Sequence, residues 1–287
     1  MKYVTFPYIR KILLLICLFP VLLLPSNARE FPASRQPVNI LLIGRDDHAG
    51  TGNGRSDCIL LCTYQPEQQT LTMTSILRDL YVSIPGHRDN RINAAFAYGG
   101  MDLLERTVEE NFRIAVDGSI LVDFTRFPPL IDLLGGVVLA LRADEAESIN
   151  ETTRSDLTAG KHLLNGDQAL AYVRIRKLDN DGDFSRTGRQ RKLLQALVES
   201  YRSASLPQIL QVLEKAVSLV ETNLSRRQIF QTVFRLTPQL SGLRLLQQHV
   251  PAEGTYEYRT IRGMCVLVAD MDAARALLSA TLTPPTK

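Results

Sequence analysis

Short apolar runs, each bounded by glycine, proline or charged residues, recur along the chain and indicate β-strands. The run at residues 38–43 is almost wholly apolar and ends at Gly44, which is typical of a strand buried on both faces. The predicted strands are residues 38–43, 58–64, 71–76, 119–122, 137–141, 256–260 and 265–268. A turn around Pro66 joins the second and third of them, so a hairpin is expected there.

Between these strands, apolar residues spaced three and four apart predict helices. The predicted helices are residues 100–112, a segment that ends near residue 134, and residues 166–172, 184–202, 206–220, 226–236 and 272–278. In the second of these, Pro128 and Pro129 are expected to delay the start of the helix or to kink it. Ser225 and Gln228 fit a capping box for the sixth of these. Residues 143–159 are polar and are expected to be irregular or partly helical. Strands that alternate with helices predict one α/β domain with helices over a mixed sheet.

The first 28 residues have the pattern of a secretory leader. Basic residues end at Lys11, an apolar run follows at residues 12–24, and small residues close at Ala28. An apolar run of 13 residues is short for a membrane span, which needs about 20 residues. Retention of the segment as an N-terminal membrane anchor stays an alternative. Either way we expect residues 29–37 to be a linker and residues 38–287 to form an exported body.

Charge and cysteine content narrow the classes of function. Without the three basic residues of the leader, 30 basic residues face 30 acidic ones, and a neutral body argues against nucleic-acid binding. No helix-turn-helix pattern is present either. Cys58 and Cys62 lie about 13 Å apart on a predicted strand, too far for a disulfide. Together with Cys265 they are interpreted as buried thiols, although a pairing of Cys265 with one of them stays open.

Acidic and basic residues gather at the ends of the predicted strands. Asp46 and Asp57 bracket a glycine-containing loop, and two such carboxylates could share a Mg²⁺ ion or could be solvated loop charges. Arg78 and Asp79 follow a strand, and Arg91 introduces a helix. These residues could bind an anion, or they could form surface ion pairs and a helix cap.

Residues 173–190 hold the densest cluster of arginines. Arg174 and Arg176 would point to the same side of an extended segment. Arg186, Arg189 and Gln190 have the spacing of one helix face. Guanidinium groups clamp phosphate oxygens well, although a solvated helix face would look the same. Together with the two preceding clusters, this segment favours an anion site.

Eight motifs occur in an order that resembles the LytR-CpsA-Psr family. They are Val-Asn-Ile-Leu-Leu-Ile-Gly-Arg-Asp, Gly-Arg-Ser-Asp, Ser-Ile-Leu-Arg-Asp, Arg-Ile-Asn-Ala-Ala-Phe-Ala-Tyr-Gly-Gly, Val-Asp-Phe, Leu-Gly-Gly-Val, Leu-Asn-Gly-Asp-Gln-Ala-Leu-Ala-Tyr-Val-Arg-Ile-Arg and Gly-Asp-Phe-Ser-Arg-Thr-Gly-Arg-Gln. The match spans residues 39–196, and residues 203–287 resemble the usual tail of that family. The chain departs from the family pattern in several places. Asp47 and His48 stand where the family often has a small residue followed by arginine, Leu77 replaces proline, and Arg91 replaces lysine. The leader is also shorter than the membrane anchor that is typical of the family.

The resemblance implies an extracytoplasmic α/β/α sandwich that binds a polyprenyl-pyrophosphate lipid in an apolar tunnel. Its expected location is the outer face of the cytoplasmic membrane, or the cell wall or periplasmic space. Such enzymes move a glycan-1-phosphate, as in teichoic acid or capsular polysaccharide attachment, to a peptidoglycan hydroxyl with Mg²⁺ or Mn²⁺. Transferred to this chain, the catalytic residues would be Arg78, Asp79 and Asp183, with the role of each carboxylate left open. The pyrophosphate ligands would be Arg55, Arg78, Arg91, Arg174, Arg176, Arg186, Arg189 and Gln190, and the metal ligands Asp46 and Asp57. The alternative is a polyprenyl-phosphate-binding protein or lipid pyrophosphatase without transfer activity.

Overall fold

A computed structural model describes residues 36–46, 54–176, 178–179 and 183–282. The predicted leader and most of the predicted linker lie outside these residues, as do the side chains of Asp46 and Arg55. In the described part of the chain, no helix is both long enough and apolar enough to cross a membrane.

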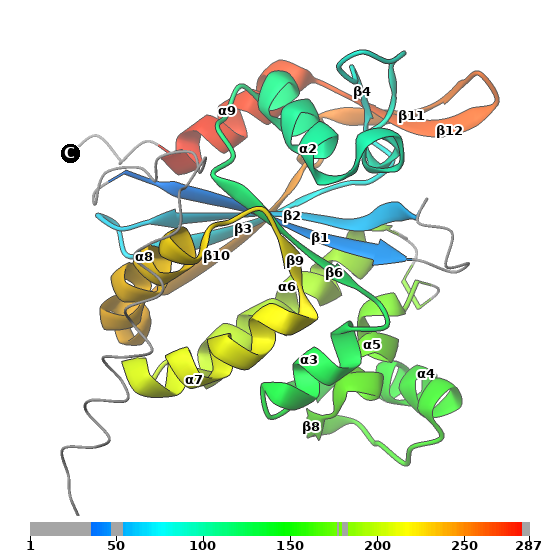
Figure 1. Cartoon of the computed structure of the whole chain (residues 1–287). Coiled ribbons are helices and arrows are strands. Elements are labelled where there is room, and N and C mark those ends of the chain that lie inside the picture. Colours follow the sequence, from blue (N-terminus) through cyan, green and yellow to red (C-terminus); the bar gives the residue numbers. More distant parts are fainter. Residues whose placement is uncertain (1–35, 47–53, 177, 180–182, 283–287) are drawn as a thin grey trace, which may run out of the picture.

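A six-stranded mixed sheet forms the centre of the molecule, in the order β10-β3-β2-β1-β6-β9 (Figure 1). Its strands are β1 (Val38–Asp46), β2 (Arg55–Gln65), β3 (Thr70–Ile76), β6 (Gly118–Asp123), β9 (Glu221–Thr222) and β10 (Arg244–Val250). β2 pairs antiparallel with both β1 and β3, while β6 runs parallel to β1 and β10 runs parallel to β3. The prediction of a mixed sheet is therefore confirmed.

Helices cover both faces of this sheet, which gives the expected three-layer sandwich (Figure 1). One face carries α2 (Asn93–Phe112) and α9 (Met271–Leu282). The other face carries α6 (Asp183–Ser200), α7 (Leu206–Ala216) and α8 (Arg226–Leu236), together with α3 (Phe127–Leu133), α4 (Ala143–Thr153) and α5 (Gly166–Arg174). The 3₁₀ turns η2 (Val217–Leu219) and η3 (Thr237–Gly242) follow α7 and α8.

Three two-stranded ribbons surround the sheet. They are β4 (Tyr81–Val82) with β5 (Asn90–Arg91), β7 (Val137–Leu141) with β8 (Gly160–Leu164), and β11 (Tyr256–Ile261) with β12 (Met264–Ala269). The β11–β12 hairpin lies against the segment that follows β3, because the N–H of Leu267 donates to the carbonyl of Asp79. Residues from two distant parts of the sequence thus meet at one end of the sheet.

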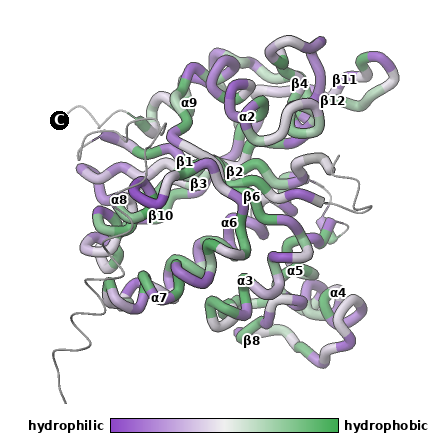
Figure 2. Tube along the Cα trace, in the orientation of Figure 1, coloured by the Kyte–Doolittle hydropathy of each residue, from purple (hydrophilic) through white to green (hydrophobic). Residues whose placement is uncertain are grey.

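Side chains alternate between the two faces of each central strand; all seven residues of β3 are buried, but in β1 and β6 the two faces are buried to different extents. Leu41 and Ile43 of β1 belong to the fully buried core shared with α2 and α9. Ile40 and Leu42, on the opposite face, are only partly buried. Figure 2 shows hydrophobic residues along the central strands and again along α6 and α7. The face toward α6 and α7 is therefore apolar but less completely covered.

Several predicted boundaries need correction. α5 continues through Arg174, so this residue ends a helix and does not belong to an extended segment. Residues 143–153 form helix α4, which agrees with the expectation that residues 143–159 are irregular or partly helical. β10 was missed, because it is an edge strand with little burial and has no apolar alternation. Cys265 is exposed, so its interpretation as a buried thiol was wrong; Cys58, Cys62 and Cys265 are all free.

Candidate functional site

A β-bulge in β2 sets the direction of Asp57. Gly44 of β1 pairs with Cys58, but the next residue, Arg45, pairs with Ser56, so Asp57 is the extra residue between two pairs. Bulges of this kind redirect a side chain and are common beside active sites. Gly44 is required at this position, since a Cβ added there would lie 2.8 Å from the Cβ of Cys58. The bulge allows Asp57 to reach the end of the neighbouring strand.

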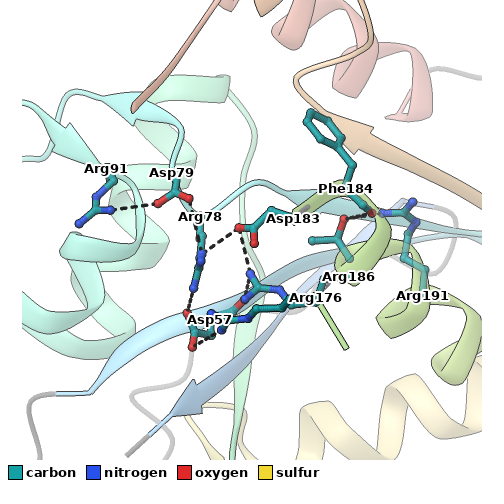
Figure 3. Close-up of polar contacts among 10 residues, drawn as sticks. Asp57, Arg78, Asp79, Arg91, Arg176, Asp183, Phe184, Arg186 and Arg191 are labelled. Atoms are coloured by element: carbon teal, nitrogen blue, oxygen red, sulfur yellow. Dashed lines mark hydrogen bonds and ion pairs between the residues drawn. The ribbon is translucent and has the colours of Figure 1, made fainter. Parts of the chain in front are cut away.

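Arg78 lies at the centre of the site and joins two carboxylates from distant segments (Figure 3). Its Nη1 donates to Oδ1 of Asp57 at 2.5 Å, and its Nε donates to Oδ2 of Asp183 at 2.8 Å. Burial alone would lower the pKa of Arg78, but Asp183 and Asp57 outweigh this effect and leave the pKa raised. Arg78 therefore stays charged and holds β2 and the start of α6 together.

The turn that carries Arg78 also carries Asp79. Asp79 Oδ1 accepts from Nη1 of Arg91 at 3.2 Å, and its Oδ2 lies 3.6 Å from Nε of Arg78 (Figure 3). The carbonyl of Arg78 accepts from the N–H of Asn93 at the start of α2. The backbone of this turn is thus fixed on both sides, which orients its two charged side chains.

Arg186 enters the site from the first turns of α6 and is 2% exposed. Its Nη2 donates to the carbonyl of Asp57 and to Oδ2 of Asp183, both at 3.1 Å. Its Nε and Nη1 are buried and have no hydrogen-bond partner among the residues that the structure describes. Burial lowers the pKa of Arg186, because the nearby carboxylates do not fully compensate for the loss of water. A buried cation with two unused donors is well suited to receive an anion.

Arg176 completes the cluster from the segment that follows α5. Its Nη2 lies 3.5 Å from Oδ2 of Asp57, and nearly half of its side chain is exposed. Arg174, by contrast, ends α5 with its guanidinium carbon 4.9 Å from the ring centre of Phe124. The expectation that the two side chains share one side of a strand was wrong, because Arg174 belongs to a helix, although both residues line the hollow described below.

Arg189 does not join the cluster around Asp57. It is buried on α6, where its Nε donates to Oε1 of Glu145 at 3.0 Å and its Nη2 donates to Asp179. Arg186 and Arg189 therefore contact different carboxylates, and the predicted pyrophosphate-binding role of Arg189 stays a prediction. Gln190 is partly buried one turn after Arg186, and its role stays a prediction.

The charges of the cluster do not balance. Four guanidinium groups, those of Arg78, Arg91, Arg176 and Arg186, face the three carboxylates of Asp57, Asp79 and Asp183. The site therefore has one surplus positive charge among its described side chains. Such a surplus, partly shielded from water, favours binding of an anionic group.

The described residues can hold a divalent metal only in part. Among them, no group of three or more His, Cys, Asp or Glu side chains is arranged to bind a metal ion. Asp57 already has an arginine near each carboxylate oxygen. Mg²⁺ nevertheless needs only one or two protein carboxylates when substrate phosphates supply the other oxygens. Asp57 fits that role, and Asp46 lies on the strand beside it, paired with Arg55 across β1 and β2.

An incompletely covered apolar layer lies between the sheet and α7. Ile120 and Val122 of β6, like Ile40 and Leu42 of β1, are only partly buried although their strands are central. α7 is strongly amphipathic, yet none of its residues is buried. Ile209 of α7 packs against the small cluster that contains Val38, so the apolar side of the helix faces the sheet.

A hollow of about 650 Å³ with a mixed polar and apolar lining opens beside Arg176, between α4 and α5. Its lining includes Ser148, Thr152, Asp167, Leu170 and Arg174. Arg176 lines this hollow and also contacts Asp57, so the hollow and the charged cluster are continuous.

Some residues of this region were not predicted from the sequence. Glu145 and Asp179 hold Arg189, but neither residue stands in a motif that would reveal such a long-range pair. Phe184 stacks on Tyr256 of β11 with ring centres 5.2 Å apart. An aromatic residue next to Asp183 was the available signal for that contact.

Comparison with known proteins agrees with these features. The chain is 39% identical over 208 residues to the polyisoprenyl-teichoic acid–peptidoglycan teichoic acid transferase TagV of Bacillus subtilis. The aligned region covers 69% of this chain and 53% of TagV. The chain thus spans about half of the length of that relative. The crystal structure of B. subtilis TagT superposes with a TM-score of 0.70 at 29% identity, covering 88% of this chain and 94% of TagT.

A second TagT structure contains a bound octaprenyl pyrophosphate lipid. It superposes with a TM-score of 0.67 at 28% identity over 88% of this chain and 93% of that one. The model of the LytR_cpsA_psr family matches residues 24–280, which is most of the sequence. The chain therefore belongs to the LytR-CpsA-Psr family.

Proposed function

We propose that this chain is an extracytoplasmic phosphotransferase that moves a glycan-1-phosphate from a polyprenyl-pyrophosphate carrier to a hydroxyl of peptidoglycan. The observation that carries the proposal is the position of Arg186. This buried cation has two donor nitrogens without a partner among the described residues and lies within a cluster with surplus positive charge. Its helix α6 covers the same face of the sheet as α7, which borders the incompletely covered apolar layer (Figure 1). An amphiphile with a pyrophosphate head and a polyprenyl chain matches both halves of this arrangement.

The proposed binding mode follows from the same residues. Arg78, Arg176 and Arg186 would donate to the pyrophosphate oxygens, because planar guanidinium groups form paired, charge-assisted hydrogen bonds with phosphates. The polyprenyl chain would lie against Leu42 and Ile120, where burial of apolar surface contributes about 25 cal/mol per Å². The glycan of the donor would extend toward the hollow beside Arg176.

The proposed reaction is an in-line displacement at the phosphorus atom that carries the glycan. A bond forms from the acceptor oxygen to that phosphorus, the bond to the bridging oxygen breaks, and polyprenyl phosphate leaves. Arginines that are already in place would stabilise the charge that grows on the phosphate oxygens, and this is the main protein contribution to phosphoryl transfer. No covalent intermediate is required.

The two remaining carboxylates would have different tasks. Asp183 accepts from both Arg78 and Arg186 through one oxygen, so its task would be to orient them. Asp79 is more exposed and has longer contacts with arginine, so it would accept the proton of the attacking hydroxyl. A magnesium or manganese ion held by Asp57 and Asp46 would neutralise charge on the pyrophosphate when bound.

The proposed location is the outer face of the cytoplasmic membrane or the cell wall. The secretory pattern of residues 1–28 and the membrane-embedded carrier both require export of the body. Fractionation of the full-length chain in its host, followed by N-terminal sequencing of the recovered protein, would test both export and cleavage at Ala28.

Incubation of the protein with a lipid-linked pyrophosphoryl glycan, Mg²⁺ and peptidoglycan oligomers tests the function. Appearance of glycan phosphate on the acceptor is expected, and it should be lost in Arg78→Ala but retained in Arg226→Ala, an exposed arginine of α8. Tight retention of the lipid without product would instead favour a polyprenyl-phosphate-binding protein. Release of glycan phosphate into solution would favour a lipid pyrophosphatase.

A further inference from the structure

Three aromatic side chains form a row that leads away from the charged cluster. Phe184 follows Asp183 directly on α6 and stacks on Tyr256 with an interplanar angle of 26°. Tyr256 in turn meets Tyr258, with ring centres 6.0 Å apart and an edge-to-face angle of 89°. Tyr256 and Tyr258 are two residues apart on β11, so both project from the same face of the hairpin. The row thus begins at the site and ends on the surface.

The outermost ring of this row is unusually exposed for a large aromatic side chain. Tyr258 is 60% exposed, whereas Tyr256 is partly covered. Partial desolvation raises the pKa of Tyr258, and the charges of Tyr256, Asp183, Cys265 and Asp79 raise it further. Tyr258 therefore lies within electrostatic range of Asp79 and Asp183, two of the three carboxylates of the site.

The hairpin that carries Tyr258 is fixed to the site by hydrogen bonds. Tyr258 is paired across the hairpin with Leu267, whose N–H donates to the carbonyl of Asp79 at 2.9 Å. At the hairpin turn, Nη2 of Arg262 donates to the hydroxyl of Tyr81 and to the carbonyl of Asp89, both at 2.6 Å. β12 therefore lies between the backbone of Tyr258 and that of Asp79, and these hydrogen bonds hold Tyr258 at a defined position relative to the site.

From this arrangement we infer that Tyr258, supported by Tyr256 and Phe184, is the platform on which a sugar ring of the acceptor glycan binds. The C–H groups on one face of a pyranose are weakly positive, and they pack on the negative face of an aromatic ring. A glycan bound on this ring can extend across β12 and present a hydroxyl to Asp79. This inference rests on the proposed phosphotransfer function and specifies its acceptor site.

The acceptor is favoured over the donor glycan because of the direction of the reaction. In an in-line displacement, the attacking oxygen and the leaving oxygen lie on opposite sides of phosphorus. The leaving polyprenyl phosphate belongs to the apolar layer on the α6–α7 side of the sheet. The β11–β12 hairpin lies on the other side, with α2 and α9 (Figure 1). The acceptor must therefore approach from the hairpin.

Two substitutions at one position and one control test this assignment in the full-length protein. Tyr258→Ala removes the ring, Tyr258→Phe keeps it, and Glu257→Ala changes an exposed neighbour on the opposite face of β11. Initial rates of transfer are measured with peptidoglycan oligomers varied at a fixed lipid-linked donor, and then with the donor varied. Binding of the oligomers to the protein without donor is measured separately by calorimetry.

We expect Tyr258→Ala to raise the KM for the acceptor about 10-fold, which corresponds to about 1.4 kcal/mol. The KM for the donor should stay unchanged, and Tyr258→Phe and Glu257→Ala should behave like the wild type. A rise in donor KM with unchanged acceptor KM would assign the platform to the donor glycan and overturn the inference, as would wild-type kinetics. If the wild type transfers nothing, the proposed function fails, and calorimetry then decides alone: the platform stands only if oligomer binding is lost in Tyr258→Ala.

Discussion

Arg186 and Arg189 stand one helical turn apart on α6, are almost equally buried, and should respond in opposite ways to replacement by methionine. Arg186 is 2% exposed and Arg189 is 4% exposed. Methionine keeps the apolar length of each side chain but removes the charge and the donors. We expect Arg186→Met to remove ligand binding with little effect on stability, and Arg189→Met to unfold the protein more easily while binding is kept.

The magnitudes follow from the contacts of each guanidinium. Arg186 forms two charge-assisted hydrogen bonds at 3.1 Å, worth about 1.5–3 kcal/mol each, but leaves two buried donors unpaired, which costs about 1–3 kcal/mol each. These contributions nearly cancel, and Asp183 keeps its bond to Arg78. The free energy of unfolding should therefore change by less than about 2 kcal/mol in Arg186→Met.

Arg189→Met has less compensation, because only one donor nitrogen of Arg189, Nη1, is buried without a hydrogen-bond partner among the described residues. It leaves Glu145, which is itself buried, without its cationic partner, and breaking a buried ion pair costs about 3–5 kcal/mol. For ligand binding, by contrast, Arg186→Met should have the larger effect of the two substitutions. Loss of the two donors of Arg186 that could bind a phosphate should weaken binding by about 3–6 kcal/mol, which is roughly 10²–10⁴-fold.

Urea unfolding followed by circular dichroism gives the free energies, and calorimetry with a short-chain prenyl pyrophosphate gives the affinities. Both variants are compared with the wild type at one pH and salt concentration. If Arg186→Met lost as much stability as Arg189→Met and still bound the ligand, Arg186 would be a structural residue. The assignment of the anion site to α6 would then be wrong.

Three further predictions concern other parts of the molecule. Leu42→Trp should fill the apolar layer and weaken binding of a long-chain prenyl pyrophosphate about 10-fold or more, while calorimetry with inorganic pyrophosphate shows no change. Burial works to raise the pKa of Asp123, but hydrogen bonds from Thr125 and Arg126 outweigh it and leave the pKa lowered. Asp123 therefore contributes stability above its unfolded pKa of about 4, and this contribution is lost as the pH falls through the lowered pKa of the folded state. The free energy of unfolding in urea should differ clearly between Asp123→Asn and the wild type at pH 7, and hardly at pH 2. Burial raises the pKa of Cys58 to about 11 and that of Cys62 to about 12, so iodoacetamide at pH 8 should label Cys265 first, as read by peptide mass spectrometry.

The central strands could be predicted because burial on both sides leaves a strong pattern in the sequence. β1, β2 and β3 were recognised from their apolar runs. β10 was not, because a strand at the edge of a sheet needs only its backbone to pair, and its side chains need not be apolar. Its parallel pairing with β3 connects residues some 174 positions apart, and no local pattern encodes such a pairing.

The composition of the site could be predicted better than its geometry. A spacing of two residues between Arg174 and Arg176 suggested a strand, but the capping box of Asn165 and Gln168 begins a helix that includes Arg174. Arg189 was grouped with Arg186 by helical spacing, although a carboxylate 44 residues away holds it elsewhere. The bulge at Asp57 is a mismatch between two strands, so neither strand reveals it alone.

The charged cluster and the apolar layer are built by different sets of residues, and this separation decides what kind of ligand the molecule can select. Arg78, Asp57 and Arg186 come from the end of β3, the bulge of β2 and the start of α6, where regular pairing stops. The apolar layer comes from the middle of β1 and β6, where the strands are regular. A free phosphate would use only the first set, and a plain hydrocarbon only the second. Binding energy from both sets is available only to an amphiphile whose anionic group lies at the end of a long apolar chain. Substitutions in the charged cluster should therefore weaken binding of the anionic head, and substitutions in the apolar layer should weaken binding of the chain, independently of each other.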